Sequence, residues 1–296
     1  MSNHKALIVY GATCSGKSSF LSEYLRRLLP QGAKARIYTC EHYDAYDDVV
    51  NEGLAEVWRF NNRPHPFYTT HKVVENYWPE NLLDPKSLLK APGPDFYDRY
   101  PVRIYEGIFT TGQYITSNHV EGGLLERAGR GEKFGGQEMD HIQFMDGEIG
   151  VGGMNWPMYN VSQNELVGLV EKSQEYPGHV IWTSHEDEGK QNGKTVLGPA
   201  VIGNKMTTAI GAKFGNLWHA VEVPTFVNVA SSDEKKTVFE KRLYLKPHLF
   251  PGTQLLCLSK TSVSLRNQAK IPDYMQMSKG GLPDLEACDR LIKLLG

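Results

Sequence analysis

The chain carries no excess charge of either sign and few cysteines. Its 32 lysines and arginines nearly balance 34 aspartates and glutamates, so the formal net charge at pH 7 is −2. A charge this small creates no overall field that would attract nucleic acid or a membrane surface. The cysteines of the 296-residue chain, Cys14, Cys40, Cys257 and Cys288, form no C-x-x-C pair. They favour free thiols in a reducing cytoplasm, where we expect the protein, over a disulfide framework.

Two further signals are missing. No apolar run approaches the length that spans a membrane, and no N-terminal signal pattern is present, so we expect no membrane partner. The ten histidines show neither an H-E-x-x-H motif nor a regular Cys/His ligand spacing. The sequence therefore does not predict a structural zinc site.

The most informative feature that is present lies near the N-terminus. Residues 11–18 read Gly-Ala-Thr-Cys-Ser-Gly-Lys-Ser and match G-x-x-x-x-G-K-[ST]. An apolar run of strand length, residues 6–10, precedes them, and apolar residues at helical spacing follow from Phe20 until Pro30. Strand, glycine loop and helix are the context of a phosphate-binding loop, whereas the alternative is a plain glycine turn. The predicted nucleotide contacts are Gly11, Ala12, Thr13, Cys14, Ser15, Gly16, Lys17, Ser18 and Ser19.

The residue types in this loop predict its chemistry. Gly11 and Gly16 allow the backbone to bend so that successive N–H groups point at one anion. Lys17 would reach the β- and γ-phosphates, and the Ser18 hydroxyl would ligate Mg²⁺. We therefore expect ATP and Mg²⁺ as ligands.

The rest of the chain predicts an α/β fold in one domain over residues 1–296. Strands are expected at 35–40, 102–105 and 179–182, each followed by a polar group, which favours a mainly parallel sheet flanked by helices. Helices are expected at 162–174 and 284–295, and a C-terminal β-hairpin extension at 217–229 and 237–245. Residues 58–101, with seven prolines, predict an irregular insertion, and residues 121–153, with ten glycines, predict a long loop.

Polar residues at the predicted strand ends are the catalytic candidates. Glu41 ends the second strand and is the candidate base, since neighbouring strand ends converge in such sheets. For the carboxylate on the metal side, Glu106 ends a clear strand, while Asp146 follows a weaker apolar run in the glycine-rich stretch; both stay open. His185, with Thr183 and Ser184, could sense the γ-phosphate, or be an ordinary surface histidine.

These motifs together resemble the RecA-like P-loop ATPases, and in particular the bacteriophage ATP-binding proteins of that type, which include the Sak4-like recombination ATPases. The segments that match are 11–18, 38–42, 102–111, Trp156, 180–186 and 198–214. The resemblance implies that Glu41 activates water, that Thr183–His185 is a sensor, and that the protein forms a homo-oligomer. A basic residue would then complete the neighbour's site, with Arg242, Lys260 and Arg266 as candidates. Glu106 departs from the usual Asp of that family.

The interpretation that we favour is a Mg²⁺-dependent ATPase with a RecA-like core, phage-encoded and acting on DNA in recombination or replication, with single-stranded DNA as a candidate partner. Arg127, Arg130 and Lys133 in the 121–153 loop are the candidate DNA contacts, and an ordinary exposed loop is the alternative. A small-molecule or nucleotide kinase would use the same phosphate loop. A structural or assembly protein that binds nucleotide without turnover is the third possibility.

Overall fold

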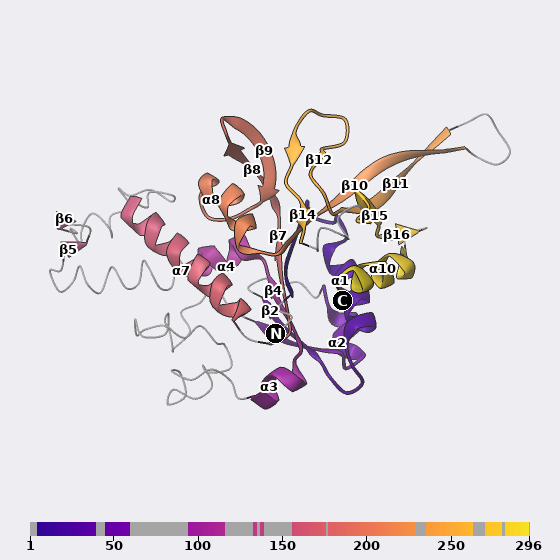
Figure 1. The fold of residues 1–296 in the computed structure, drawn as a ribbon, viewed down its shortest axis with the longest axis horizontal. Helices are drawn as coiled ribbons and strands as arrows, with labels where there is room; N and C mark the ends of the chain where they lie inside the picture. Colours follow the sequence, from indigo (N-terminus) through magenta and orange to yellow (C-terminus); the bar gives the residue numbers. More distant parts are fainter. Residues whose placement is uncertain are drawn as a thin grey trace.

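The computed structural model describes most of the chain outside the predicted insertion and the predicted glycine-rich loop. The described residues are 5–39, 45–59, 94–115, 133–134, 137–138, 156–175, 177–228, 235–262, 270–279 and 282–295. They form an α/β architecture in which one central sheet has helices on both faces (Figure 1).

The central sheet is mixed, with nine described strands. Its order is β15-β11-β10-β1-β7-β4-β2-β3, and β14 also pairs with β10. The strands are β1 (Lys5–Tyr10), β2 (Ala35–Thr39), β3 (Ala55–Arg59), β4 (Val102–Glu106), β7 (His179–Ser184), β10 (Asn216–Asn228), β11 (Lys235–Tyr244), β14 (Lys260–Thr261) and β15 (Tyr274–Gln276).

The direction of the strands corrects the prediction of a mainly parallel sheet. The six adjacent strands β10, β1, β7, β4, β2 and β3 run parallel to one another. At the other side of the sheet, β11 and β14 pair antiparallel with β10, and β15 pairs antiparallel with β11. The predicted hairpin exists as β10 and β11. Because β10 itself pairs with β1, the hairpin continues the central sheet instead of lying beside it.

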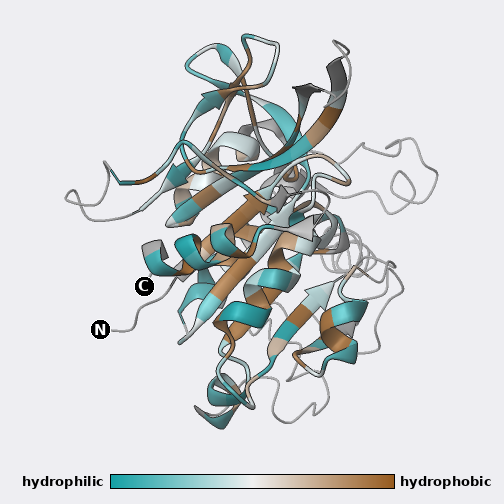
Figure 2. Ribbon diagram, turned by 90° about the vertical axis from the view of Figure 1, so that its right-hand side faces the viewer, coloured by the Kyte–Doolittle hydropathy of each residue, from teal (hydrophilic) through white to brown (hydrophobic). Residues whose placement is uncertain are grey.

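Alternation along β1 explains why both faces of the sheet are covered. Ile8 and Tyr10 pack into one buried cluster, and Leu7 and Val9 into the other, as expected for a strand whose side chains point alternately to opposite faces. Figure 2 shows hydrophobic residues along the strands and hydrophilic ones on the outer sides of the helices.

Different helices cover the two faces. The first cluster takes side chains from α4 (Ile108–Ile115), α7 (Trp156–Gln174) and the 3-10 helix η5 (Ile210–Lys213). The second takes them from α1 (Lys17–Leu28), α2 (Asp47–Asn51) and α10 (Leu285–Leu295). The remaining helices are α3 (Pro94–Arg99) and α8 (Asn204–Ala209).

A second, smaller sheet lies beyond the carboxyl end of β7. Its order is β12-β13-β9-β8, with β8 (Glu186–Gln191), β9 (Lys194–Pro199), β12 (His248–Leu249) and β13 (Leu256–Cys257). Asn192 (φ 51°) and Gly193 (φ 77°) form the turn between β8 and β9, where an Asn-Gly pair adopts positive φ readily. The short pairs β5 (Lys133–Phe134) with β6 (Gln137–Glu138) and β16 (Ser278–Lys279) with β17 (Leu282–Pro283) complete the described elements.

The predicted helices and strands are present with shifted ends. The helix predicted at 162–174 begins earlier, at Trp156, and the strand predicted at 179–182 continues to Ser184. The elements β3, α2 and α4 and the second sheet were not predicted from the sequence. Within the predicted insertion the structure describes the end of β3 and residues 94–101; residues 60–93 lie outside the described part.

Candidate functional site

The phosphate loop connects β1 to α1 in a conformation that only certain residues tolerate. Gly11 has φ 156°, Cys14 has φ 64° and Gly16 has φ 92°, directly before α1 begins at Lys17. Cys14 is thus in the left-handed region, where a non-glycine residue is uncommon. Strain of this kind clusters at functional sites.

Gly11 is required for a second reason, its close approach to β10. A Cβ atom at Gly11 would lie 2.1 Å from the carbonyl oxygen of Ala220, and one at Gly16 would lie 2.8 Å from Cδ of Lys241. The first neighbour is backbone and cannot give way, whereas the second is a flexible side chain. The loop is therefore seated directly against β10, with the stem of Lys241 across its last glycine.

Lys17 is held by the loop itself. Its Nζ donates hydrogen bonds to the carbonyl oxygens of Gly11 and Ala12, both at 2.8 Å. These acceptors are neutral, and an ammonium group bonds more strongly to an ionised acceptor. A phosphate group in the loop would therefore compete well for Lys17.

A pocket of about 560 Å³ opens over this loop. Three strand ends contribute to it: the loop after β1, Gly107 after β4, and the end of β7. Its lining residues are Thr13, Cys14, Gly16, Lys17, Ser18, Ser19, Gly107, Thr183, Ser184, His185 and Lys241. The pocket thus contains six of the nine predicted nucleotide contacts and all three residues of the predicted sensor.

Hydrogen bonds connect these strand ends. The N–H of Gly107 donates to Oγ1 of Thr183 at 2.9 Å, and the N–H of Gly11 donates to the carbonyl of Ser184 at 3.2 Å. The Ser184 hydroxyl lies 2.8 Å from the carbonyls of both His185 and Ala200, so it donates to backbone. The side chain of His185 is exposed at the pocket, so of the three predicted sensor residues it is the one best placed to meet a ligand.

Of the two candidate metal-side carboxylates and the candidate base, the structure describes only Glu106. Glu106 ends β4 as predicted, is buried with 3% exposure, and precedes Gly107 of the pocket lining; it pairs in register with Thr39 of β2. Glu41, two residues beyond Thr39, and Asp146 lie outside the described residues.

Lys241 of β11 was not among the predicted site residues, yet it lines the pocket. Arg242, Lys260 and Arg266 were predicted for a different role, to complete the site of a neighbouring copy, and that role stays a prediction. Arg242 bonds Glu240 at 3.0 Å and lies over the ring of Tyr274, and Arg266 lies outside the described residues.

The signal for Lys241 was the alternation of β11. Lys241 is two residues from the fully buried Leu243 and shares its side of the strand, whereas Arg242 points the other way. Lys260, on β14, is partly buried, and this burial lowers its pKa.

Comparisons with known proteins do not assign the chain to a family. No protein-family model matches the chain, and no curated protein matches its sequence. Within the described residues, no helix combines the length and apolar character needed to cross a membrane.

Proposed function

We propose that this protein binds ATP with Mg²⁺ in the pocket over residues 11–19 and hydrolyses it. The single observation that carries the proposal is the pocket itself. A strained phosphate loop, two lysines and the polar end of β7 converge there from separate parts of the chain. A cavity lined by convergent polar groups at the carboxyl ends of parallel strands is where α/β proteins bind ligands.

The chain offers residues for each part of the reaction. Backbone N–H groups of the loop and the start of α1 would bind the phosphates, with Lys17 and Lys241 supplying positive charge. Ser18, which lines the pocket, and the buried Glu106 would hold Mg²⁺, which neutralises charge on the β- and γ-phosphates. Both are oxygen ligands, as Mg²⁺ prefers.

Hydrolysis would proceed by attack of water on the γ-phosphorus. The new P–O bond forms as the bond from the γ-phosphorus to the bridging oxygen breaks, and the water proton passes to a carboxylate, for which Glu41 is our candidate. ADP leaves with the bridging oxygen.

The position of β7 supports a RecA-like ATPase with a sensor. β7 lies between β1, which leads into the phosphate loop, and β4, which ends in Glu106. A change at His185 on phosphate release can therefore reach both neighbours through the bonds that Thr183 and Ser184 make to Gly107 and Gly11.

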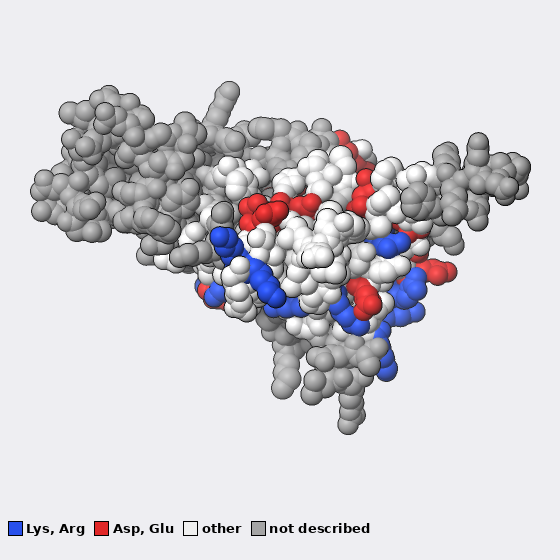
Figure 3. Space-filling view, turned by 90° about the horizontal axis from the view of Figure 1, so that it is seen from above, with Lys and Arg blue, Asp and Glu red and all other residues white. Residues whose placement is uncertain are grey.

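Single-stranded DNA and assembly with further copies are part of the proposal on the strength of the resemblance alone. Seen from the end that carries β8 and β9, the described surface intersperses lysines and arginines with acidic groups and has no broad basic field (Figure 3). DNA binding of this protein would therefore be weak and sensitive to salt.

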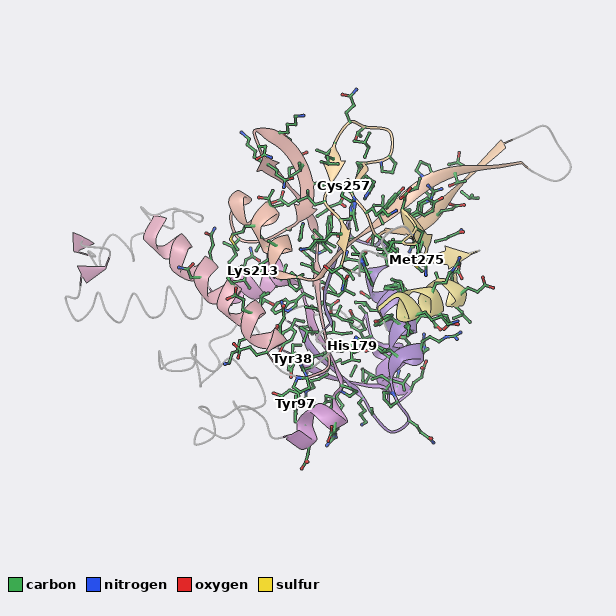
Figure 4. The ribbon with its side chains drawn as sticks, viewed as in Figure 1. Tyr38, Tyr97, His179, Lys213, Cys257 and Met275 are labelled. Atoms are coloured by element: carbon green, nitrogen blue, oxygen red, sulfur yellow. The ribbon has the colours of Figure 1, made fainter. Side chains whose placement is uncertain are left out.

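The decisive experiment measures phosphate release from ATP and Mg²⁺ by the wild type, Lys17→Ala and Lys213→Ala. We expect Lys17→Ala to abolish turnover, and Lys213→Ala to retain it. Lys213 is a matched control because it is exposed, pairs with Glu171 at 2.6 Å and does not line the pocket (Figure 4).

Three outcomes separate the alternatives. Phosphate transfer only after an acceptor is added would indicate a kinase, and binding without release would indicate a nucleotide-binding assembly protein. Turnover that single-stranded DNA neither stimulates nor inhibits at low salt, with no DNA binding, would remove the DNA part alone.

A further inference from the structure

Beside the pocket, three potential metal ligands meet from three strands. His219 of β10, His248 of β12 and Cys257 of β13 bring one ligand atom each within 4.8 Å of one another. His219 and Cys257 are fully buried and His248 is partly buried. Figure 4 shows Cys257 on the side of the sheet where the second sheet lies, far from Tyr97. The cluster therefore joins the central sheet to the second sheet.

The hydrogen bonds of the two imidazoles determine which nitrogens face each other. Nε2 of His219 lies 2.9 Å from a carboxylate oxygen of Glu186, and Nδ1 of His248 lies 3.3 Å from the carbonyl oxygen of Lys246. A carboxylate and a carbonyl only accept, so each of these nitrogens carries the proton of its ring. The opposite nitrogens, Nδ1 of His219 and Nε2 of His248, then present lone pairs to each other at 3.2 Å.

Two lone pairs at this distance repel unless a cation lies between them. Neutral imidazole nitrogens are common ligands of divalent metal ions, so a metal ion held by Nδ1 of His219 and Nε2 of His248 would remove this repulsion.

The separation also fits a metal. Two nitrogens on a tetrahedral ion with bonds of about 2.0–2.1 Å are roughly 3.3 Å apart, close to the 3.2 Å observed here. A sulfur at about 2.3 Å would lie roughly 3.5 Å from each nitrogen, and the three ligand atoms lie within 4.8 Å of one another, so the sulfur of Cys257 must move inward by about 1.3 Å at most. Glu186 completes the arrangement, because ligating histidines commonly donate their second N–H to a carboxylate.

We propose that His219 Nδ1, His248 Nε2 and Cys257 Sγ bind a Zn²⁺-class ion. The carboxylate of Glu186 orients the ring of His219, and the bound ion holds the second sheet to the central sheet. On binding, the Cys257 thiol loses its proton to solvent as the sulfur–metal bond forms. The fourth position takes water. A short spacing motif is absent because the ligands come from separate strands.

Cobalt substitution tests the site without nucleotide. Co²⁺ titrated into the purified, metal-stripped full-length protein should bind once per chain, with tetrahedral d–d bands and a thiolate charge-transfer band. We expect Cys257→Ser to lose the charge-transfer band, and His248→Gln and Glu186→Gln each to weaken binding by about 10–100-fold.

Cys288→Ser is the matched control. Cys288 is also buried, and burial raises the pKa of its thiol to about 12, as burial does for Cys257. It lies on α10, away from the cluster, so the variant should keep the wild-type spectrum. Absence of stoichiometric binding to the folded wild type, or a charge-transfer band that survives Cys257→Ser, would overturn the proposal. Circular dichroism of each variant confirms folding before titration, and the milder His248→Gln tests the site should Cys257→Ser not fold.

Discussion

The two ends of the central sheet use charge in opposite ways. At the amino end, the carboxylate of Glu56 accepts from Lys34 at 2.9 Å, Arg36 at 3.0 Å, Arg99 at 2.9 Å and the hydroxyl of Tyr100. The cations there are matched to an anion of the chain itself. At the carboxyl end, lysines gather around a pocket instead.

The difference lies in the partners of the cations. The bonds of Lys17 described above go to neutral loop carbonyls, and Lys241 lies with its stem across Gly16. In the network around Glu56, the positive charges already have a carboxylate partner. Such a network stabilises the fold and leaves little positive charge available to bind an anionic ligand. Lys17 and Lys241 both line a pocket that is open to a ligand, so the second arrangement is the one to expect of a binding site for an anion.

The largest expected effect tests whether ligand binding at the carboxyl end of the central sheet depends on the backbone geometry of the loop at Gly11. In Gly11→Ala, the new Cβ would clash with the carbonyl of Ala220 at 2.1 Å, so the loop must move. We expect ATP affinity to fall about a hundredfold or more, which corresponds to ~2.7 kcal/mol. Isothermal titration calorimetry measures it.

Gly168→Ala is the control for that substitution. Gly168 lies within α7, and a Cβ there meets nothing within 4 Å. The variant should keep ATP affinity and gain about 0.5–1 kcal/mol of stability, because alanine favours a helix. Equal affinities of the Gly11→Ala and wild-type proteins would contradict the role given to the loop.

A smaller effect tests whether cations at the two ends really differ. We expect Lys241→Met to weaken ATP binding about tenfold, ~1.4 kcal/mol, because a positive charge beside the phosphates is lost. Lys34→Met, which removes a cation from the Glu56 network, should leave ATP affinity unchanged. Fluorescent-nucleotide titrations of both variants make the comparison. Equal losses of ATP affinity in the two variants would contradict the difference that we draw between cations at the two ends of the sheet.

The smallest effect concerns the amino end alone. Partial burial raises the pKa of Glu56, but the hydrogen bonds from Tyr100, Lys34 and Arg99 outweigh it and lower this pKa to about 2. The depressed pKa means that the stabilisation is present above pH 4.5 and is lost as the pH falls toward 2.

Glu56→Gln should therefore remove part of the acid sensitivity of the free energy of unfolding. We expect a difference below about 1 kcal/mol, because partly exposed ion pairs are screened by solvent. Urea unfolding across this pH range measures it, and identical pH profiles for variant and wild type would show that the network contributes nothing.

The sequence predicted what is local and missed what depends on packing. The phosphate loop is a run of eight residues, and its strand and helix were visible as apolar patterns on either side. The end of β4 at Glu106 was predicted for the same reason. The mixed sheet was not, because no local pattern shows that β10 pairs with β1.

The residues missed at the site have a common physical cause. Lys241 faces the pocket only because β11 pairs with β10 in one register, which matches Glu222 to Lys241. Thr183 itself was predicted as a sensor. The hydrogen bond that its Oγ1 accepts from the N–H of Gly107 was not predicted, because it depends on β7 lying beside β4. Likewise His219, His248 and Cys257 meet only after two sheets pack together.

One aromatic stack gives these neighbouring sites a shared component. Tyr10, the residue before Gly11, stacks on His219 with ring centroids 4.3 Å apart and planes 6° from parallel. A ligand that fixes His219 thereby restrains the residue from which the phosphate loop departs. If both proposed ligands bind, thermodynamic linkage requires that the factor by which the ion at His219 changes the affinity for ATP equals the factor by which ATP changes the affinity for that ion.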